Sequence, residues 1–178
     1  SRIGELVSLR WGLSQSNNWI SAYLMTRLSA FELVNMIHTF GVVNRDIYPS
    51  PALCLGPCEI SVGEMASAYT AFVNKGLRCA PLLVTKIEDA DGNEIAKFSP
   101  QMSEVISAQS AQNMLSMLIA VINEGTGRRV RRYTQAHVGG KTGTTQNNSD
   151  GWFVGFTPSL VTACWVGGED RDIHFRSM

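Results

Sequence analysis

Apolar residues recur every three or four positions over four stretches of the chain, the spacing of amphipathic helices. The expected helices span residues 6–28, 30–40, 60–75 and 107–124. A polar run at 14–18 interrupts the first of these, so we expect two helical pieces around a polar turn. Gly41, Gly76 and Gly125 follow the other three as helix stops, and Ser107 is placed to cap the last helix.

Runs of β-branched and aromatic residues between turn residues predict short strands. Residues 82–87 and 94–98 flank the turn 89–93 and predict a β-hairpin, whereas the proline-rich segment 49–57 predicts a surface loop. Three further strands are expected towards the end of the chain, at 137–141, 151–156 and 160–166. The predicted fold class is therefore α+β, with helices packed on a small antiparallel sheet. Three aromatic residues are expected to pack this sheet onto the helix 107–124: Trp152, Phe153 and Phe156.

Composition excludes several classes of function. The 178 residues, 44% of them hydrophobic, suit one globular domain. Fifteen basic residues balance fifteen acidic ones, which disfavours a nucleic-acid binder, and no apolar run is long enough for a membrane span. The three histidines show no ligand spacing, so we expect no metal and no cofactor. The four cysteines are too few for a disulfide scaffold, and whether Cys54 and Cys58 pair is left open.

A glycine-flanked Lys-Thr-Gly triplet at 141–143 is the most informative segment. Glycines on both sides let another backbone approach a strand closely, so Lys141, the Thr142 hydroxyl and the Thr144 amide would lie along an accessible edge. Such an edge can bind an extended peptide as an added strand, with the lysine charge available to a carboxylate. The pattern predicts a site for a peptide that ends in a carboxylate.

A second candidate is the Ser16-Asn17-Asn18 run in the polar break between the first two helical pieces. Ser and Asn favour turns and helix caps for local reasons, which gives this run a purely structural interpretation. Side chains in such a break are also free to point into a cleft, so a role for Ser16 and Asn18 in a site is the alternative.

Together these segments resemble the bifunctional, class A penicillin-binding transpeptidases. The resemblance covers residues from about 6 to 168 and rests on Ser-x-Asn at 16–18, Lys-Thr-Gly-Thr-Thr at 141–145 and Asp-Gly-Trp-Phe-Val-Gly-Phe-Thr-Pro at 150–158. Three further segments support it: 64–69, 72–76 and 124–127. It implies an incomplete transpeptidase fold of the penicillin-binding and serine β-lactamase type.

One departure from the family pattern is decisive for activity. No serine of this chain is followed three residues later by lysine, so the Ser-x-x-Lys motif that supplies the nucleophile is missing. We expect residues 1–178 to be the C-terminal portion of a transpeptidase domain, truncated upstream, inactive alone and incompletely folded because the family's central sheet needs strands from elsewhere. A degenerate domain that has lost catalysis is the alternative.

The resemblance also implies roles for individual residues. The missing serine would attack a D-Ala-D-Ala bond of a peptidoglycan stem peptide, or a β-lactam, and form an acyl-enzyme. Ser16 would relay a proton to the leaving amine, Asn18 would bind the substrate backbone, and Lys141 would remain cationic. The substrate carboxylate would meet Thr142 and Thr144 beside Gly143, and the Thr144 N–H would form half of an oxyanion hole.

Several alternatives stay open at this stage. A D,D-carboxypeptidase or β-lactamase shares the motifs but resolves the acyl-enzyme with water, and a non-catalytic peptidoglycan-peptide-binding or scaffold module needs no nucleophile. In the family the parent chain carries an upstream glycosyltransferase domain and an N-terminal anchor in the cytoplasmic membrane, and works outside that membrane. Four arginines form a basic cluster that is either a solvated loop or a contact for an anionic cell-wall polymer or neighbouring domain: Arg128, Arg129, Arg131 and Arg132.

Overall fold

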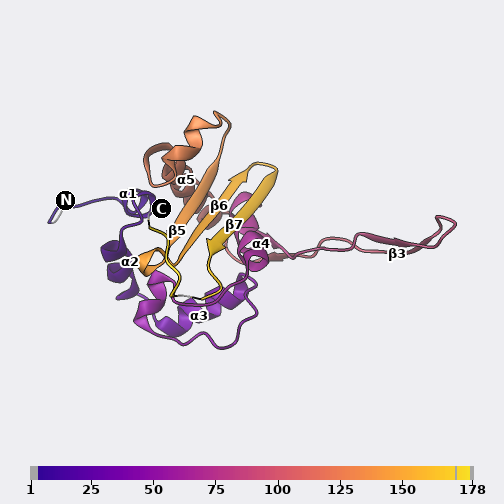
Figure 1. Cartoon of the computed structure of the whole chain (residues 1–178), viewed down its shortest axis with the longest axis horizontal. Helices are drawn as coiled ribbons and strands as arrows, with labels where there is room; N and C mark the ends of the chain where they lie inside the picture. The colour runs from indigo at the N-terminus through magenta and orange to yellow at the C-terminus, as the bar shows by residue number, and fades with distance from the viewer. Residues whose placement is uncertain (1–3, 171, 177–178) are drawn as a thin grey trace.

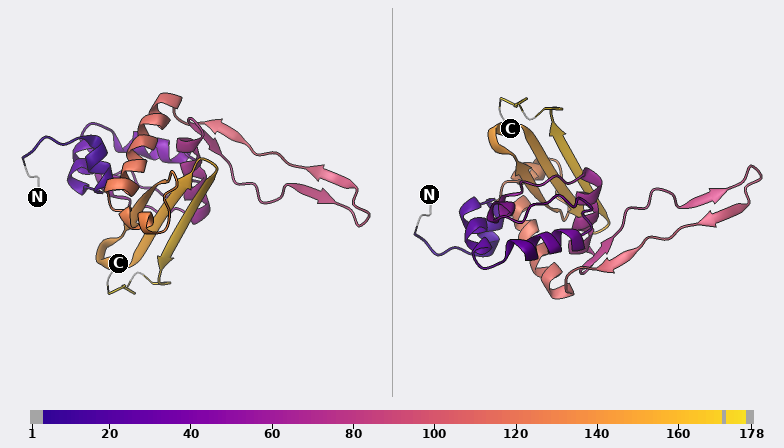
Figure 2. Two further views of the ribbon diagram at one scale, coloured as in Figure 1. Left: turned by 90° about the horizontal axis from the view of Figure 1, so that it is seen from above. Right: turned by 90° about the horizontal axis from the view of Figure 1, so that it is seen from below.

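The computed structural model describes residues 4–170 and 172–176. Five α-helices and a three-stranded sheet form its main body, and a long hairpin projects from that body (Figures 1 and 2). The helices are α1 (Leu9–Ser14), α2 (Asn18–Met25), α3 (Ala30–Thr39), α4 (Val62–Val73) and α5 (Ala108–Glu124). All the predicted helices are present, and the first stretch is divided at the polar run as expected.

Serine side chains begin four of these helices, α1, α3, α4 and α5, because a hydroxyl oxygen can accept a hydrogen bond from a backbone N–H that the first turn leaves unpaired. Ser107 caps α5 in this way, as predicted. Ser29 and Ser61 go further and form capping boxes with Glu32 and Glu64, in which serine and glutamate each bind the other's backbone N–H. These starts are therefore fixed by contacts three residues apart along the chain.

The prediction that residues 49–57 form a surface loop is wrong in part. It contains the 3₁₀ helix η1 (Pro51–Leu55), and Leu53 is buried in a small core with Val42 and Ile47. The prolines favour the turn, but burial of one leucine, which is favourable by about 1.5–3 kcal/mol, holds the segment against α3. All four cysteines are free thiols, including the two in and beside this segment.

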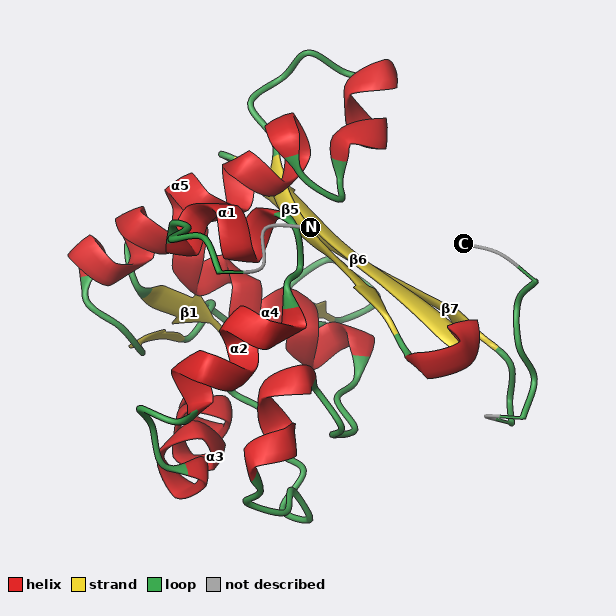
Figure 3. Cartoon of the chain, turned by 90° about the vertical axis from the view of Figure 1, so that its left-hand side faces the viewer, coloured by secondary structure: helices red, strands yellow, loops and turns green. Residues whose placement is uncertain are grey.

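The C-terminal sheet has the strand order β5-β6-β7, antiparallel throughout, as predicted. Its strands are β5 (Gly139–Thr144), β6 (Asp150–Thr157) and β7 (Leu160–Gly167). Helices α4 and α5 pack against it, and Figure 3 shows the sheet nearly edge-on beside them. The buried side chains of Leu118, Val121 and Ile122 lie in α5, which makes this helix the centre of the core.

Phe156 of β6 confirms its predicted packing role, since it is buried and lies over Gly139 beside Ile119 of α5. Phe153 instead covers the glycines Gly140 and Gly155, with only partial burial. Trp152 is likewise only partly buried, whereas the successive residues Val154, Gly155 and Phe156 are all buried, so burial along β6 does not follow the simple alternation that was expected.

Two short sheets were less well predicted. The hairpin pairs β2 (Lys86–Glu88) with β3 (Glu94–Lys97), so the expected first strand starts late and residues 82–85 lie outside it. A second pair, β1 (Leu77–Cys79) with β4 (Met102–Glu104), joins the base of this hairpin to the body and was not predicted. Strands of three residues carry too short a pattern to stand out in a sequence.

Candidate functional site

Ser16 lies in the tight link between α1 and α2, and local hydrogen bonds explain its conformation. The N–H of Ser16 donates to the Leu13 carbonyl at 3.1 Å, and that of Asn17 to the Gly12 carbonyl at 2.9 Å. This is the Schellman pattern, which needs a left-handed residue where glycine is usual, and Ser16 has a φ of +53°. A non-glycine residue held in this region marks a strained position that tertiary contacts must stabilise.

Asn17 begins α2 at once, because its Oδ1 accepts from the N–H of Ile20 at 3.1 Å. The capping interpretation of the Ser-Asn-Asn run is therefore correct for Asn17 alone. Since the helix start is satisfied by Asn17, the Ser16 side chain is left to point elsewhere.

Lys141 is the partner of Ser16. Its Nζ donates to the Ser16 Oγ at 2.6 Å across 125 positions of sequence, and also to the Thr142 carbonyl at 2.9 Å. Burial lowers the pKa of Lys141, because removing an ammonium group from water disfavours its charged form. The site thus holds a partly buried lysine within hydrogen-bond reach of a strained serine.

Strand β5, which carries Lys141, is an end strand of the sheet. Within residues 4–170 and 172–176 no strand pairs with its outer edge, so backbone groups there are free to meet an extended ligand. Gly140 is required on the inner side, where a Cβ would lie 2.5 Å from the Val154 carbonyl oxygen. The edge predicted from the glycine-flanked triplet is present.

The turn after α5 contributes a residue that the sequence did not single out as a site residue. Thr126 Oγ1 lies 2.5 Å from Thr142 Oγ1, and the Thr126 N–H donates to the Ser14 carbonyl at 3.0 Å. The run 124–127 was noted only as part of a family resemblance, and no local pattern marks a threonine in a turn as functional. Ser16, Lys141, Thr142 and Thr126 are called the polar cluster below.

The remaining predicted residues lie near this cluster in sequence but form no hydrogen bond with it. The Asn18 side chain is exposed in the first turn of α2 and, in the part of the chain described, has no hydrogen-bond partner. Thr144 is exposed at the end of β5, and Gly143 pairs with Trp152. Their assigned roles stay predictions, since each concerns a bound substrate.

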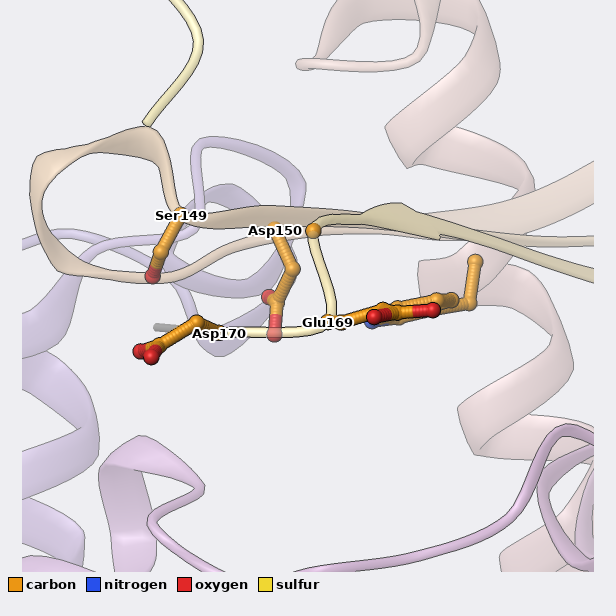
Figure 4. A pocket seen from close by; sticks show the side chains of 6 residues that line it. Ser149, Asp150, Glu169 and Asp170 are labelled. Carbon is orange, nitrogen blue, oxygen red and sulfur yellow. The ribbon is translucent and has the colours of Figure 1, made fainter. Parts of the chain in front are cut away.

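A cavity of about 270 Å³ lies at the start of β6 (Figure 4), and its lining includes no residue of the polar cluster. It is lined by Ser149, Asp150, Trp165, Gly168, Glu169 and Asp170. The Oδ1 atom of Asp150 is buried there without a partner among the described residues. Over that same part of the chain, no group of three or more His, Cys, Asp and Glu residues is placed to hold a metal ion.

The basic cluster forms the 3₁₀ helix η2 (Arg128–Arg132) directly after the Thr126 turn. Arg131 is structural, because its guanidinium donates to Asn123 Oδ1 at 2.7 and 3.0 Å and to the Ala136 carbonyl at 2.6 Å. The other three side chains are exposed and are called the exposed arginines: Arg128, Arg129 and Arg132. The solvated interpretation suits these three but not Arg131.

Comparisons with known proteins agree with this arrangement. Residues 1–167 match the family described as penicillin binding protein transpeptidase domain. The chain is 37% identical over 162 residues to penicillin-binding protein 1A of Aquifex aeolicus, covering 90% of this chain and 22% of that protein. It is 31% identical over 171 residues to penicillin-binding protein 1A of Neisseria meningitidis, covering 93% and 21%. The chain thus spans about a fifth of the length of these relatives.

Solved structures give the same result for the fold. Penicillin-binding protein 1A from Haemophilus influenzae superposes with a TM-score of 0.90 at 26% identity, over 97% of this chain and 32% of that one. PonA1 from Mycobacterium tuberculosis, solved in complex with penicillin V, superposes with a TM-score of 0.82 at 26% identity, over 97% and 51%. The α+β arrangement described above is therefore that of a penicillin-binding transpeptidase domain.

Proposed function

Because this chain belongs to the penicillin binding protein transpeptidase domain family, we propose that it is the C-terminal portion, residues 1–178, of a serine D,D-transpeptidase that cross-links peptidoglycan. The observation that carries the proposal is the 2.6 Å hydrogen bond from Lys141 to Ser16. It joins the two family motifs found in this sequence into one site. The parent chain, meaning this sequence continued upstream through a Ser-x-x-Lys segment, would supply the nucleophile.

The reaction begins with attack of the upstream serine Oγ on the carbonyl carbon of a D-Ala-D-Ala bond. The C–N bond breaks, the terminal D-Ala leaves as an amine, and an ester to the serine remains. The amine of a second stem peptide then attacks this ester, restores the serine hydroxyl and completes the cross-link. This chain's residues serve both steps by moving a proton and holding the peptide.

Ser16 is suited to pass that proton. An ammonium group has donors and no acceptor, so in the 2.6 Å contact the Ser16 oxygen accepts from Lys141. The Ser16 hydroxyl hydrogen remains available to the leaving amine, and the nearby positive charge makes it a better donor. Asn18, with its side-chain amide exposed and unpartnered in the described structure, would hydrogen-bond the peptide backbone.

The carboxylate of the terminal D-Ala would bind at β5. Lys141 supplies charge, and the hydroxyls of Thr142 and Thr144 supply hydrogen bonds beside Gly143, which leaves room for the ligand's backbone. The Thr144 N–H would form half of the oxyanion hole, the upstream serine the other half, and each such donor is worth about 3 kcal/mol in hydrolases of this kind. A β-lactam, which also carries a carboxylate next to a reactive carbonyl, would use the same contacts.

The proposal extends to the parent's surroundings by resemblance. The parent would carry an upstream glycosyltransferase domain, be anchored in the cytoplasmic membrane and act on the extracytoplasmic side. In the described residues no helix has the length and apolar character to cross a bilayer. We expect the site described here to use no cofactor and no metal, and the chain to bind no nucleic acid.

The experiment is the intact mass of the parent chain after incubation with a penicillin, with the 178-residue chain as control. We expect one stoichiometric adduct on the parent and none on the shorter chain, because the nucleophile lies upstream. A folded parent without an adduct would contradict the proposal and favour a peptide-binding or scaffold module. Product analysis with a stem peptide and an acceptor amine then separates transfer from the hydrolysis expected of a carboxypeptidase or β-lactamase.

A further inference from the structure

We propose that Thr126 is a positioning residue of this site, which orients the Thr142 hydroxyl towards the ligand carboxylate. The inference deepens the proposed function and rests on it. Thr126 lies outside both motifs that identify the site, and it reaches the site only through the fold.

Contact between the two threonines is direct. Their Oγ1 atoms are 2.5 Å apart, a short hydroxyl–hydroxyl hydrogen bond, although 16 positions separate them in sequence. Thr126 is exposed and Thr142 is partly buried, so the pair lies where a ligand on the β5 edge would meet them. In the described part of the chain neither hydroxyl forms another side-chain hydrogen bond within the polar cluster, which leaves each free to respond to a ligand.

The backbone at the end of α1 holds Thr126 in place. Its N–H donates to the Ser14 carbonyl at 3.0 Å, two residues before Ser16. Gly125 makes this approach possible, since a Cβ there would lie 2.2 Å from that same carbonyl oxygen. On the other side of the turn, the Gln15 amide donates to the Glu124 carbonyl at 3.0 Å. Thr126 therefore contacts both the α1–α2 segment that carries Ser16 and strand β5.

The chemistry of a carboxylate then sets the direction of the hydrogen bonds. An ionised carboxylate can only accept, so Thr142 must donate its hydrogen to the ligand. The Thr142 oxygen is then free to accept, and Thr126 is the donor 2.5 Å away. Hydrogen bonds in such a chain polarise one another, so the Thr126 hydroxyl strengthens the contact between Thr142 and the carboxylate. Without this contact, the Thr142 hydroxyl loses the partner that fixes its orientation and can rotate away from the carboxylate.

The test is a double-mutant cycle in the parent chain, with Thr126→Val, Thr142→Val and both together. The readout is the second-order rate of acylation by a fluorescent penicillin. We expect Thr126→Val to slow acylation about three- to tenfold, the effect of one hydrogen bond, and Thr126→Ser to restore most of it. In the Thr142→Val background the Thr126 change should add little, because its partner is already gone.

Two controls separate positioning from a general structural effect. Thr39→Val removes an exposed hydroxyl that donates to the Asn35 carbonyl at 2.9 Å on α3, outside the cluster, and should leave the rate unchanged. The same penicillin with its carboxylate esterified should acylate the wild type and Thr126→Val equally slowly, since the accepting carboxylate is gone. Loss of protein stability would slow both penicillins alike.

The outcomes distinguish this inference from the proposed function. If the wild-type parent forms no adduct, the proposed function fails. If it does, and Thr126→Val reacts as fast as wild type, or the two substitutions are additive, Thr126 is not a positioning residue. A rate that falls equally for the acid and the ester would also overturn the inference.

Discussion

Replacement of Gly125 by alanine adds a single methyl group where the turn after α5 packs against the end of α1. The added Cβ would lie 2.2 Å from the Ser14 carbonyl oxygen and 2.9 Å from the Cα of Val121. The Gly125 φ of −114° suits alanine, so backbone conformation does not oppose the change. The perturbation is steric, and both neighbours are backbone atoms that no rotamer change can move.

The size of the effect follows from these contacts. Overpacking against backbone costs about 1–3 kcal/mol. Displacing the Ser14 carbonyl also weakens its bond from the Thr126 N–H, by about 0.5–1.5 kcal/mol. Together we expect a loss of about 1.5–4.5 kcal/mol in the free energy of unfolding. A shift of about 1 Å in the segment that carries Ser16 should also slow acylation by one to two orders of magnitude.

Urea denaturation and penicillin acylation of the parent chain measure the two quantities. Gly63→Ala is the matched control, because this glycine lies in α4 and a Cβ there has no heavy atom within 4 Å. Alanine at a helical position reduces the freedom of the unfolded chain, so Gly63→Ala should stabilise the protein by up to about 1 kcal/mol. Acylation should be unchanged in this variant.

The two glycine variants should therefore move stability in opposite directions. Equal stability of Gly125→Ala and Gly63→Ala would refute the close approach at Ser14. Normal acylation by a destabilised Gly125→Ala would refute the claim that this contact sets the position of Ser16.

Three further predictions concern charged groups. Burial lowers the pKa of Lys141, so the rate at which a penicillin acylates the parent chain should decline, as the pH rises, before the ordinary lysine value of 10.5 is reached. Lys141→Arg should move that decline to higher pH whatever its residual rate, and a decline at the same pH would contradict this assignment. Hydrogen bonds from Val43 and Ser61 lower the pKa of Glu64 from its ordinary value of 4.5. The unfolded chain therefore binds this proton first, so the stabilisation is fully present above the ordinary pKa and is lost as the pH falls through the folded pKa. Glu64→Gln should flatten the stability curve from about pH 5 to pH 3 in urea titrations, and curves of equal slope would count against the assignment. Changing the exposed arginines to Gln should alter the free energy of unfolding by no more than about 0.5 kcal/mol and leave acylation unchanged. Arg131→Met should lower the free energy of unfolding by about 1–3 kcal/mol in urea denaturation, and equal effects would argue against a structural role for Arg131 alone.

Much of the secondary structure could be predicted because its signals are local. Helix starts at Ser29, Ser61 and Ser107 depend on a hydrogen bond to a residue three positions away, and that spacing is written in the sequence. The three-residue strands β1 and β4 were missed, since their pairing joins residues about 25 positions apart with no pattern long enough to detect. Leu53 was assigned to a surface loop because the prolines of the segment 49–57 indicate a turn but do not indicate which of its side chains are buried.

By itself, the sequence determined the α+β class, the order of the α-helices and of the three C-terminal strands, and the edge strand that carries Lys141. Only the tertiary structure decided which serine and threonine hydroxyls form hydrogen bonds with the side chains of strand β5. Ser16 reaches Lys141 across 125 positions, and Thr126 reaches Thr142 from a turn with no distinguishing pattern. The reason is physical: a cap or a turn is stabilised by neighbours along the chain, whereas these contacts exist only because α5 packs between α1 and β5 and brings their ends together.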